Sequence, residues 1–197
     1  CIQVHRISIF RLMEIRIRCT KCYEDRHATP LEVACHKCNG PLEVDPETPI
    51  REPFTISLGE GDTSVVHMKR IGRLLGMDDL FAKLEFLNPT GSFKDRGSTA
   101  LISMLKRFNV QRVAEDSSGN AGASIAAYCA KAGIEATIFA PASAPAMKLD
   151  QISFYGANVK RIEGGREAVT RACQNFCLDQ NIVYASHNLS PYFIEGT

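Results

Sequence analysis

Four cysteines have the spacing of a metal site. They form two Cys-x-x-Cys pairs, Cys19 with Cys22 and Cys35 with Cys38, and twelve residues separate the pairs. Each pair can turn both of its sulfurs toward one ion, so the spacing predicts a tetrahedral zinc site of the zinc-ribbon type. Because four protein ligands leave no place for an activated water, we expect the zinc to be structural rather than catalytic. A redox dithiol and four unconnected thiols are the alternatives, and the doubled spacing weakens both.

Charge argues against a nucleic-acid-binding ribbon. Between residues 19 and 44 three lysines or arginines stand against four acidic residues, and the whole chain carries a formal net charge of +1. Such a balance gives no attraction to nucleic acid or to a membrane surface. His27 and His36 are expected to lie at the surface, because four cysteines already satisfy zinc. Clustered thiols indicate metal binding in a reducing compartment, so we expect a cytoplasmic protein.

A lysine in the segment 88–97 has the position of a nucleophile. The segment reads Asn-Pro-Thr-Gly-Ser-Phe-Lys-Asp-Arg-Gly, and it leads into a predicted helix. The positive end of that helix disfavours the charge of Lys94. A lysine whose charge is disfavoured suits Schiff-base chemistry, in which the neutral amine attacks a carbonyl group. A solvated lysine at a helix start is the alternative.

A second segment, 116–122, has the composition of an anion site. It reads Asp-Ser-Ser-Gly-Asn-Ala-Gly between a predicted strand and a predicted helix. Small residues let the backbone approach a ligand, and hydroxyls and helix N–H groups can bind a carboxylate. The alternative is plain N-capping of the helix by Ser117, Ser118 or Asn120.

The elements that position these segments alternate along the chain of 197 residues, of which 45% are hydrophobic. Five apolar strand candidates alternate with four helical stretches, and the pattern predicts a parallel sheet covered by helices on both faces. Ligand sites in such sheets lie beyond the carboxyl ends of the strands, where both segments fall. The strand candidates are 80–84, 111–114, 136–140, 157–162 and 182–185, and the helices are 98–108, 121–132, 146–154 and 166–179.

The N-terminal region is predicted to be organised separately. Apolar and charged residues alternate from Met13 to Arg18, which indicates a strand, and further strands are expected around Leu31 and Val33 and around Leu42 and Val44. We expect Met13 to be the natural start, residues 1–12 to be an upstream tail, residues 13–48 to be the ribbon, and residues 49–197 to be the catalytic body. Three prolines between residues 45 and 53 mark the boundary.

The two segments together resemble those of the threonine synthase family among the fold type II pyridoxal-phosphate enzymes. Residues 89–97 (Pro-Thr-Gly-Ser-Phe-Lys-Asp-Arg-Gly) and 117–122 (Ser-Ser-Gly-Asn-Ala-Gly) carry the resemblance behind the four-cysteine ribbon. Residues 59–63 (Gly-Glu-Gly-Asp-Thr) are similar to the family's entry motif. The resemblance runs from Met13 to Thr197, and it implies the three-layer α/β fold with a parallel sheet found in the tryptophan synthase β family, with a small mobile subdomain at about residues 115–190.

The resemblance also implies an activity and its residues. Lys94 would be the catalytic lysine that binds pyridoxal phosphate and carries protons, and Asn120 would hydrogen-bond the cofactor's 3′-oxygen. Ser117, Ser118 and Gly119 would hold the substrate carboxylate. The family's reaction converts O-phosphohomoserine and water to threonine and phosphate, a step of threonine biosynthesis that breaks a carbon–oxygen bond to phosphate. The expected partner is therefore a small phosphorylated amino acid, with no nucleic acid and no membrane, and self-association of a full-length form stays open.

Two features depart from the family pattern. The family's glycine-rich cradle for the cofactor phosphate is missing, since the 14 glycines never form a run longer than two. Phe193 stands where some relatives carry a cation near the substrate phosphate. The sequence is thus expected to be an N-terminal fragment that retains cofactor weakly or not at all. Three alternatives to a threonine synthase remain: a threonine dehydratase-like ammonia-lyase, a cysteate synthase-like enzyme acting on phosphoserine, and a non-catalytic zinc-ribbon binding module.

Overall fold

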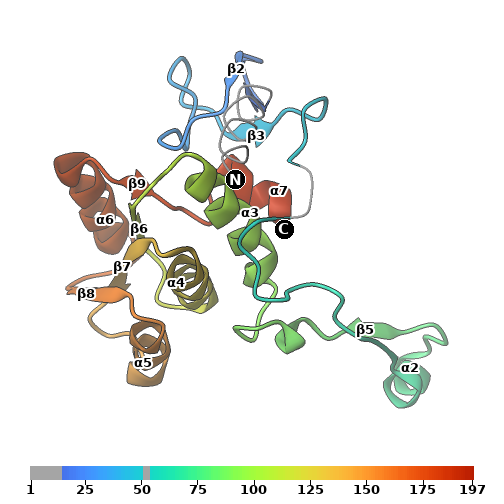
Figure 1. Ribbon diagram of the computed structural model, residues 1–197. Coiled ribbons are helices and arrows are strands. Elements are labelled where there is room, and N and C mark those ends of the chain that lie inside the picture. The colour runs from blue at the N-terminus through green and yellow to red at the C-terminus, as the bar shows by residue number, and fades with distance from the viewer. Residues whose placement is uncertain (1–14, 51–53) are drawn as a thin grey trace, which may run out of the picture.

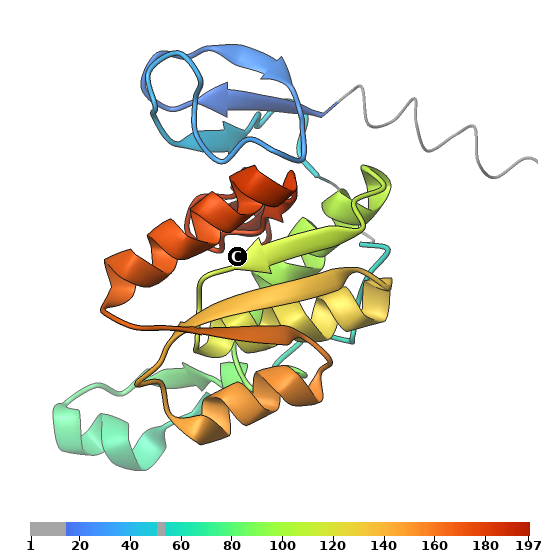
Figure 2. The ribbon, with the colours of Figure 1, turned by 90° about the vertical axis from the view of Figure 1, so that its left-hand side faces the viewer.

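The computed structural model describes residues 15–50 and 54–197 (Figures 1 and 2). The predicted tail 1–12, the predicted start Met13 and the first residues of the predicted strand lie outside this range. A small N-terminal sheet packs on a larger α/β body, and an extended arm projects from that body (Figure 1). In the part of the chain so described, no helix has both the length and the apolar character needed to span a membrane.

The N-terminal sheet is antiparallel with strand order β2-β1-β3. Its strands are β1 (Arg16–Cys19), β2 (Asp25–His27) and β3 (Leu42–Val44). Ile17 is buried and faces Val44 across the β1–β3 pair, as the alternation predicted for both strands. The strand predicted around Leu31 and Val33 is wrong, because that stretch is irregular and Leu31 is exposed. β2 takes the place of that strand beside β1.

The body contains the predicted parallel sheet, with strand order β8-β7-β6-β9. Helix α6 covers one face of it, and α4 and α5 cover the other (Figure 1). Helix α3 packs against α4 on the side away from the sheet. The alternation of strands and helices is therefore confirmed in this part of the chain. The strands are β6 (Arg112–Glu115), β7 (Glu135–Pro141), β8 (Asn158–Ile162) and β9 (Val183–Tyr184), and the helices are α3 (Lys94–Arg107), α4 (Asn120–Ala132), α5 (Ala146–Phe154) and α6 (Arg166–Gln180).

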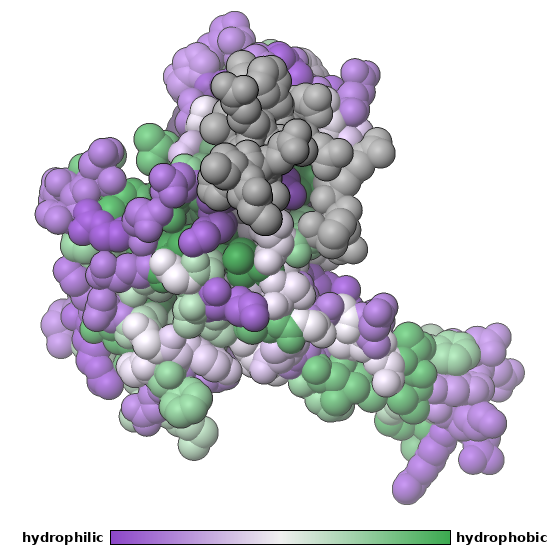
Figure 3. All heavy atoms as spheres, viewed as in Figure 1, coloured by the Kyte–Doolittle hydropathy of each residue, from purple (hydrophilic) through white to green (hydrophobic). Residues whose placement is uncertain are grey.

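The strand predicted at 80–84 does not belong to this sheet. It forms β5 (Phe81–Lys83), which pairs antiparallel with β4 (Val65–His67) in a separate two-stranded sheet. Between the two strands lies α2 (Lys69–Leu75), and the short helix η1 (Glu85–Leu87) follows β5. A run of a few apolar residues does not specify its partner, and here the nearby β4 pairs with it. Apolar side chains gather on the resulting arm (Figure 3), where those of Leu74, Leu75, Phe81 and Phe86 are exposed.

A short helix at the C-terminal end, α7 (Pro191–Gly196), joins the ribbon to the body. Gly196 and Gly97 let α7 and α3 approach closely: a Cβ atom on Gly196 would lie 2.5 Å from the Arg96 carbonyl oxygen. On the ribbon side, the Tyr192 hydroxyl donates a hydrogen bond of 2.6 Å to the Thr29 carbonyl oxygen. The ring of Phe193, 2% exposed, packs against Gly97. The ribbon, α7 and the start of α3 therefore form one continuous packed unit.

Candidate functional sites

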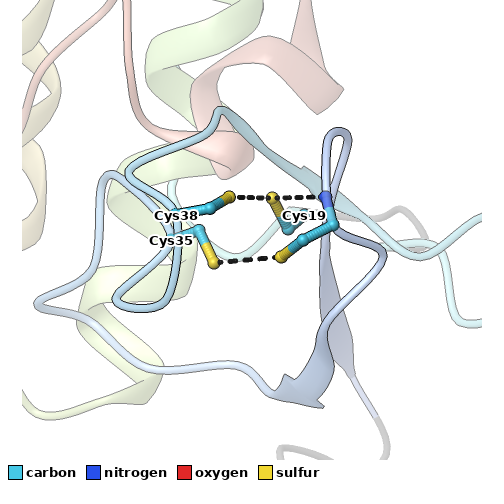
Figure 4. Close-up of side chains that lie close together, drawn as sticks. Cys19, Cys35 and Cys38 are labelled. Atoms are coloured by element: carbon cyan, nitrogen blue, oxygen red, sulfur yellow. Dashed lines mark hydrogen bonds between the residues drawn. The ribbon is translucent and has the colours of Figure 1, made fainter.

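The four ribbon cysteines converge on one point, as predicted. Their sulfur atoms all lie within 4.8 Å of one another. Cys19 Sγ lies 3.5 Å from Cys38 Sγ, and Cys22 Sγ lies 3.7 Å from Cys35 Sγ (Figure 4). Zinc bound tetrahedrally at about 2.3 Å from each sulfur needs sulfur separations of about 3.8 Å. The donor set and its dimensions therefore fit one zinc ion.

The backbone around the cluster favours a thiolate at Cys19. The amide N–H groups of Cys22 and Lys21 point at Cys19 Sγ over 3.5 and 3.4 Å. The Cys22 amide in particular lowers the pKa of the Cys19 thiol to about 6, so this sulfur is ready to bind a cation at neutral pH. A glycine is needed at position 40 because any Cβ atom there would lie only 2.9 Å from Cys19 Sγ. Any larger residue at position 40 would press on the cysteine sulfurs.

Lys94 is the first residue of α3, four residues before the start expected from the sequence. Its side chain is partly buried, with Nζ 4.6 Å from the centre of the Phe93 ring and 5.6 Å from that of Phe193. Within residues 15–50 and 54–197, no side chain forms an ion pair or hydrogen bond with this Nζ atom. A shielded amine with no acidic partner suits a nucleophile better than a structural cation.

The loop at 117–119 leads directly into α4, whose first residue is Asn120. Gly119 takes the N-cap position, and no side chain caps the helix, so the capping role considered for the two serines and Asn120 is not observed. Gly122 is required here, because a Cβ atom on it would lie 1.8 Å from the Ser117 carbonyl oxygen. The loop thus folds back tightly on the first turn of α4. This arrangement keeps the N–H groups at the start of α4 available to an anion.

The starts of α3 and α4 lie together. The Ser124 hydroxyl, one turn into α4, donates a hydrogen bond of 2.6 Å to Asp95 on the first turn of α3. Lys94 and Asn120 therefore begin two adjoining helices, as a shared cofactor site requires. The structure brings these two segments to one place, whereas the four cysteines lie apart from them in the ribbon (Figure 1).

Several polar residues near the strand ends were given no role of their own in the sequence analysis. Glu115 at the end of β6 is fully buried and lies 2.5 Å from His187 Nδ1, and burial raises the pKa of its carboxyl group. The neighbouring Asp116 accepts hydrogen bonds from Thr170 and Tyr184, at 2.5 and 2.8 Å. The signal that could have found Glu115, Asp116 and Tyr184 is their place at the carboxyl ends of β6 and β9, the edge where ligands bind in parallel sheets.

Comparison with protein families gives a match over most of the body. Residues 56–197 match the family described as pyridoxal-phosphate dependent enzyme. Threonine synthase of Methanosarcina acetivorans is 32% identical over 206 residues, covering 91% of this chain and 50% of that protein. Threonine synthase of Synechocystis sp. is 37% identical over 158 residues, covering 79% of this chain and 40% of that protein. The chain thus spans half or less of the length of these relatives.

Solved structures give the same picture. A pyridoxal 5′-phosphate-dependent aspartate racemase superposes with a TM-score of 0.64 at 29% identity, covering 68% of this chain and 42% of that one. Maize serine racemase superposes with a TM-score of 0.61 at 29% identity, covering 68% and 41%. The parallel sheet and its helices therefore follow an arrangement already known in these enzymes.

Proposed function

Because the chain belongs to the pyridoxal-phosphate-dependent enzyme family, we propose that it supplies the lysine-bearing part of a threonine synthase, with O-phosphohomoserine as the substrate. The observation that carries this proposal is the placement of a shielded, unpaired Lys94 beside the helix that begins at Asn120. The threonine synthases that match the chain support the choice within the family. Since the chain spans half or less of those relatives, the whole reaction needs the rest of the fold.

The residues present fit the part of the cofactor that reacts. Lys94 offers the amine that binds the cofactor aldehyde, and Asn120 offers an amide to the 3′-oxygen. The tight turn at Gly122, where the Ser117 carbonyl oxygen approaches the helix backbone, supports this fit. For the cofactor phosphate the chain has no glycine-rich cradle, since its glycines never form a run longer than two. We infer that this group is held by the part of the fold that the relatives have in addition.

Each residue then has a distinct task in the reaction. Bound pyridoxal phosphate supplies an electron sink for carbanions formed on the substrate. The Lys94 amine would remove protons from the substrate Cα and then Cβ, which lets phosphate depart from Cγ. It would then return a proton to Cγ, water would add at Cβ, and a last proton would return to Cα. The hydroxyls of Ser117 and Ser118 and the amide of Gly119 hold the carboxylate. Phe193 and Phe93 shield the amine from water.

The ribbon is proposed to bind one structural zinc ion through Cys19, Cys22, Cys35 and Cys38. The sulfur separations support this proposal. The ribbon is too small for much core of its own, and a metal would stabilise it. We place the protein in the cytoplasm, where thiols stay reduced.

A second candidate is an ammonia-lyase of the threonine dehydratase type. The buried Phe193 favours it, because an apolar ring 5.6 Å from the Lys94 amine does not complement a substrate phosphate. The two candidates differ in product: phosphate from phosphohomoserine or ammonia from threonine.

Two experiments test the proposal. In the first, the purified chain is incubated with pyridoxal phosphate, reduced with borohydride and mapped by mass spectrometry. Selective modification of Lys94, lost in Lys94→Ala, supports the lysine's role, whereas equal modification of exposed lysines contradicts it. In the second, a polypeptide extended to the relatives' length is assayed for phosphate release from phosphohomoserine and for ammonia release from threonine. Ammonia release alone would replace the first candidate with the second.

A further inference from the structure

A fully buried carboxylate lies next to Lys94. Asp95 is 0% exposed and lies on the first turn of α3. Its Oδ2 atom accepts a hydrogen bond of 2.7 Å from the Thr90 amide, and its Oδ1 atom accepts one of 2.5 Å from the Thr90 hydroxyl. The Ser124 hydroxyl donates a third, of 2.6 Å, to Oδ1. Among the described residues no lysine, arginine or histidine pairs with this carboxylate.

Such a group is costly unless it is well hydrogen-bonded. Removing a carboxylate from water without a cationic partner is unfavourable, and neutral donors offset only part of that cost. A residue needed only to fill this space would be apolar. The stability lost at Asp95 therefore indicates that it positions its neighbours. Hydrogen bonds are directional and fix the relative positions of the groups they join, which apolar packing does not.

The three donors come from two different segments. Thr90 lies in the loop that leads to Lys94, so its two hydrogen bonds fold the loop back on the start of α3. Ser124 lies on α4, four residues after Asn120. Its oxygen also lies 2.7 Å from Ser98 Oγ, one turn further along α3. The side chains of Asp95, Ser98 and Ser124 are buried, and that of Thr90 is half-buried.

We propose that Asp95 is a positioning residue that fixes the position of Lys94 relative to Asn120. Its carboxylate accepts hydrogen bonds both from the loop before Lys94 and from the first turns of α4. This inference rests on the proposed function, in which both residues serve one cofactor. Displacements of about 1 Å at such a site can lower the rate about a hundredfold. The gain in rate from fixed positions therefore outweighs the stability that is lost by burying the carboxylate.

The test compares four variants of the full chain. Asp95→Ala removes the acceptor, Thr90→Val removes the hydroxyl from the loop side, and Ser124→Ala removes the donor from the α4 side. The control is Ser103→Ala, which removes an equally buried hydroxyl on the same helix, where it accepts a hydrogen bond of 2.9 Å from the Ile56 amide. The control leaves the first turn of α3 untouched. If Asp95→Ala fails to fold, Thr90→Val and Ser124→Ala still test the proposal, because each removes a single donor to Asp95.

The first readout is amide hydrogen exchange of the loop 89–93, and it needs no cofactor. We expect Ser124→Ala to speed this exchange about fivefold, the factor that corresponds to one lost hydrogen bond. Ser124 forms no hydrogen bond with the loop, so the effect must pass through Asp95. Unchanged exchange in the loop, with faster exchange confined to α4, would overturn the proposal.

The second readout is borohydride-trapped modification by pyridoxal phosphate at Lys94, measured relative to the exposed Lys131. We expect the ratio to fall about threefold or more in Asp95→Ala and Ser124→Ala and to hold in Ser103→Ala. An unchanged or higher ratio would contradict positioning by Asp95. If the wild-type chain shows no preference for Lys94, the proposed function fails instead, and hydrogen exchange alone decides on Asp95.

Discussion

The Arg96 side chain donates two hydrogen bonds to the Glu85 carboxylate. Arg96 Nε donates to Glu85 Oε2 and Nη2 donates to Oε1, each over 2.9 Å. Glu85 lies in η1 at the base of the arm, and Arg96 lies on the first turn of α3, two residues after Lys94. The paired, fork-like geometry is the strongest that an arginine and a carboxylate can form. It fixes the arm to the helix that carries the candidate nucleophile.

This pair predicts a pH dependence. The Arg96 guanidinium, followed by the Thr63 hydroxyl, lowers the pKa of Glu85 from 4.5 to about 2. Because the folded-state pKa lies below the unfolded one, the stability that Glu85 contributes is present above about pH 4.5 and is lost as the pH falls toward 2. We expect Glu85→Gln to flatten the acid loss of stability over this range in urea unfolding at stepped pH. The exposed Asp150→Asn serves as the control, and equal slopes in both variants would contradict the prediction.

The hydrogen bond between Tyr192 and Thr29 predicts a measurable contribution to stability. Tyr192→Phe keeps the buried ring and removes the hydroxyl that donates to the Thr29 carbonyl. We expect the free energy of unfolding to fall by about 1 kcal/mol, the usual net worth of such a bond. Urea unfolding measures it, with Tyr23→Phe as the control, since Tyr23 is 73% exposed. Equal losses in both variants would show that the hydroxyl does not hold the ribbon to α7.

Removal of the metal is expected to unfold the ribbon. One zinc per chain should be found by elemental analysis, and Cys19→Ser or Cys35→Ser should reduce it to below about a tenth, because three ligands bind structural zinc poorly. A chelator should increase amide exchange in residues 15–50 of the wild type. Cys129→Ala is the matched control, since Cys129 is buried in α4 and lies outside the four-cysteine site. Full zinc content in Cys19→Ser would refute the site.

Gly122 predicts a steric effect at the candidate carboxylate loop. Gly122→Ala would place a Cβ atom 1.8 Å from the Ser117 carbonyl oxygen, so the loop must move. We expect a loss of about 1–3 kcal/mol in stability, as for other overpacked sites. Gly165→Ala is the control, because a Cβ atom there meets nothing within 4 Å. Comparable thermal stability of the two variants would show that the loop yields freely.

The sequence predicted well those features of the fold that depend on neighbouring residues, such as the bounds of some helices. The helix expected at 146–154 is α5 with the same bounds, and Gly133 ends α4 in the left-handed conformation that glycine favours. Helix α3 begins four residues early, and Asp95 on its first turn accepts a hydrogen bond from Ser124, which is 29 residues away. The pair of Glu115 with His187 and the docking of α7 likewise depend on distant chain segments, and β5 pairs with the neighbouring strand β4. No periodicity within one segment encodes them.

For Lys94 and Asn120 the sequence sufficed to propose roles but not to place the two residues side by side. The position of Lys94 before a helix favoured a nucleophile, whereas the cofactor contact proposed for Asn120 came from the family resemblance. Their proximity depends on the packing of α3 against α4, which arises only in the folded chain. The four cysteines are the opposite case, since two short loops within twenty residues already bring their sulfurs together.

The contact between Tyr192 and Thr29 also sets an order of events during synthesis. The two residues are 163 positions apart. At about 5–20 residues per second, a ribosome needs about 8 to 33 s to pass from one to the other. The ribbon is therefore exposed as a nascent segment well before α7 exists to receive it. Zinc capture during this interval would let the ribbon fold on its own ligands before α7 has been made, and docking on α7 would follow.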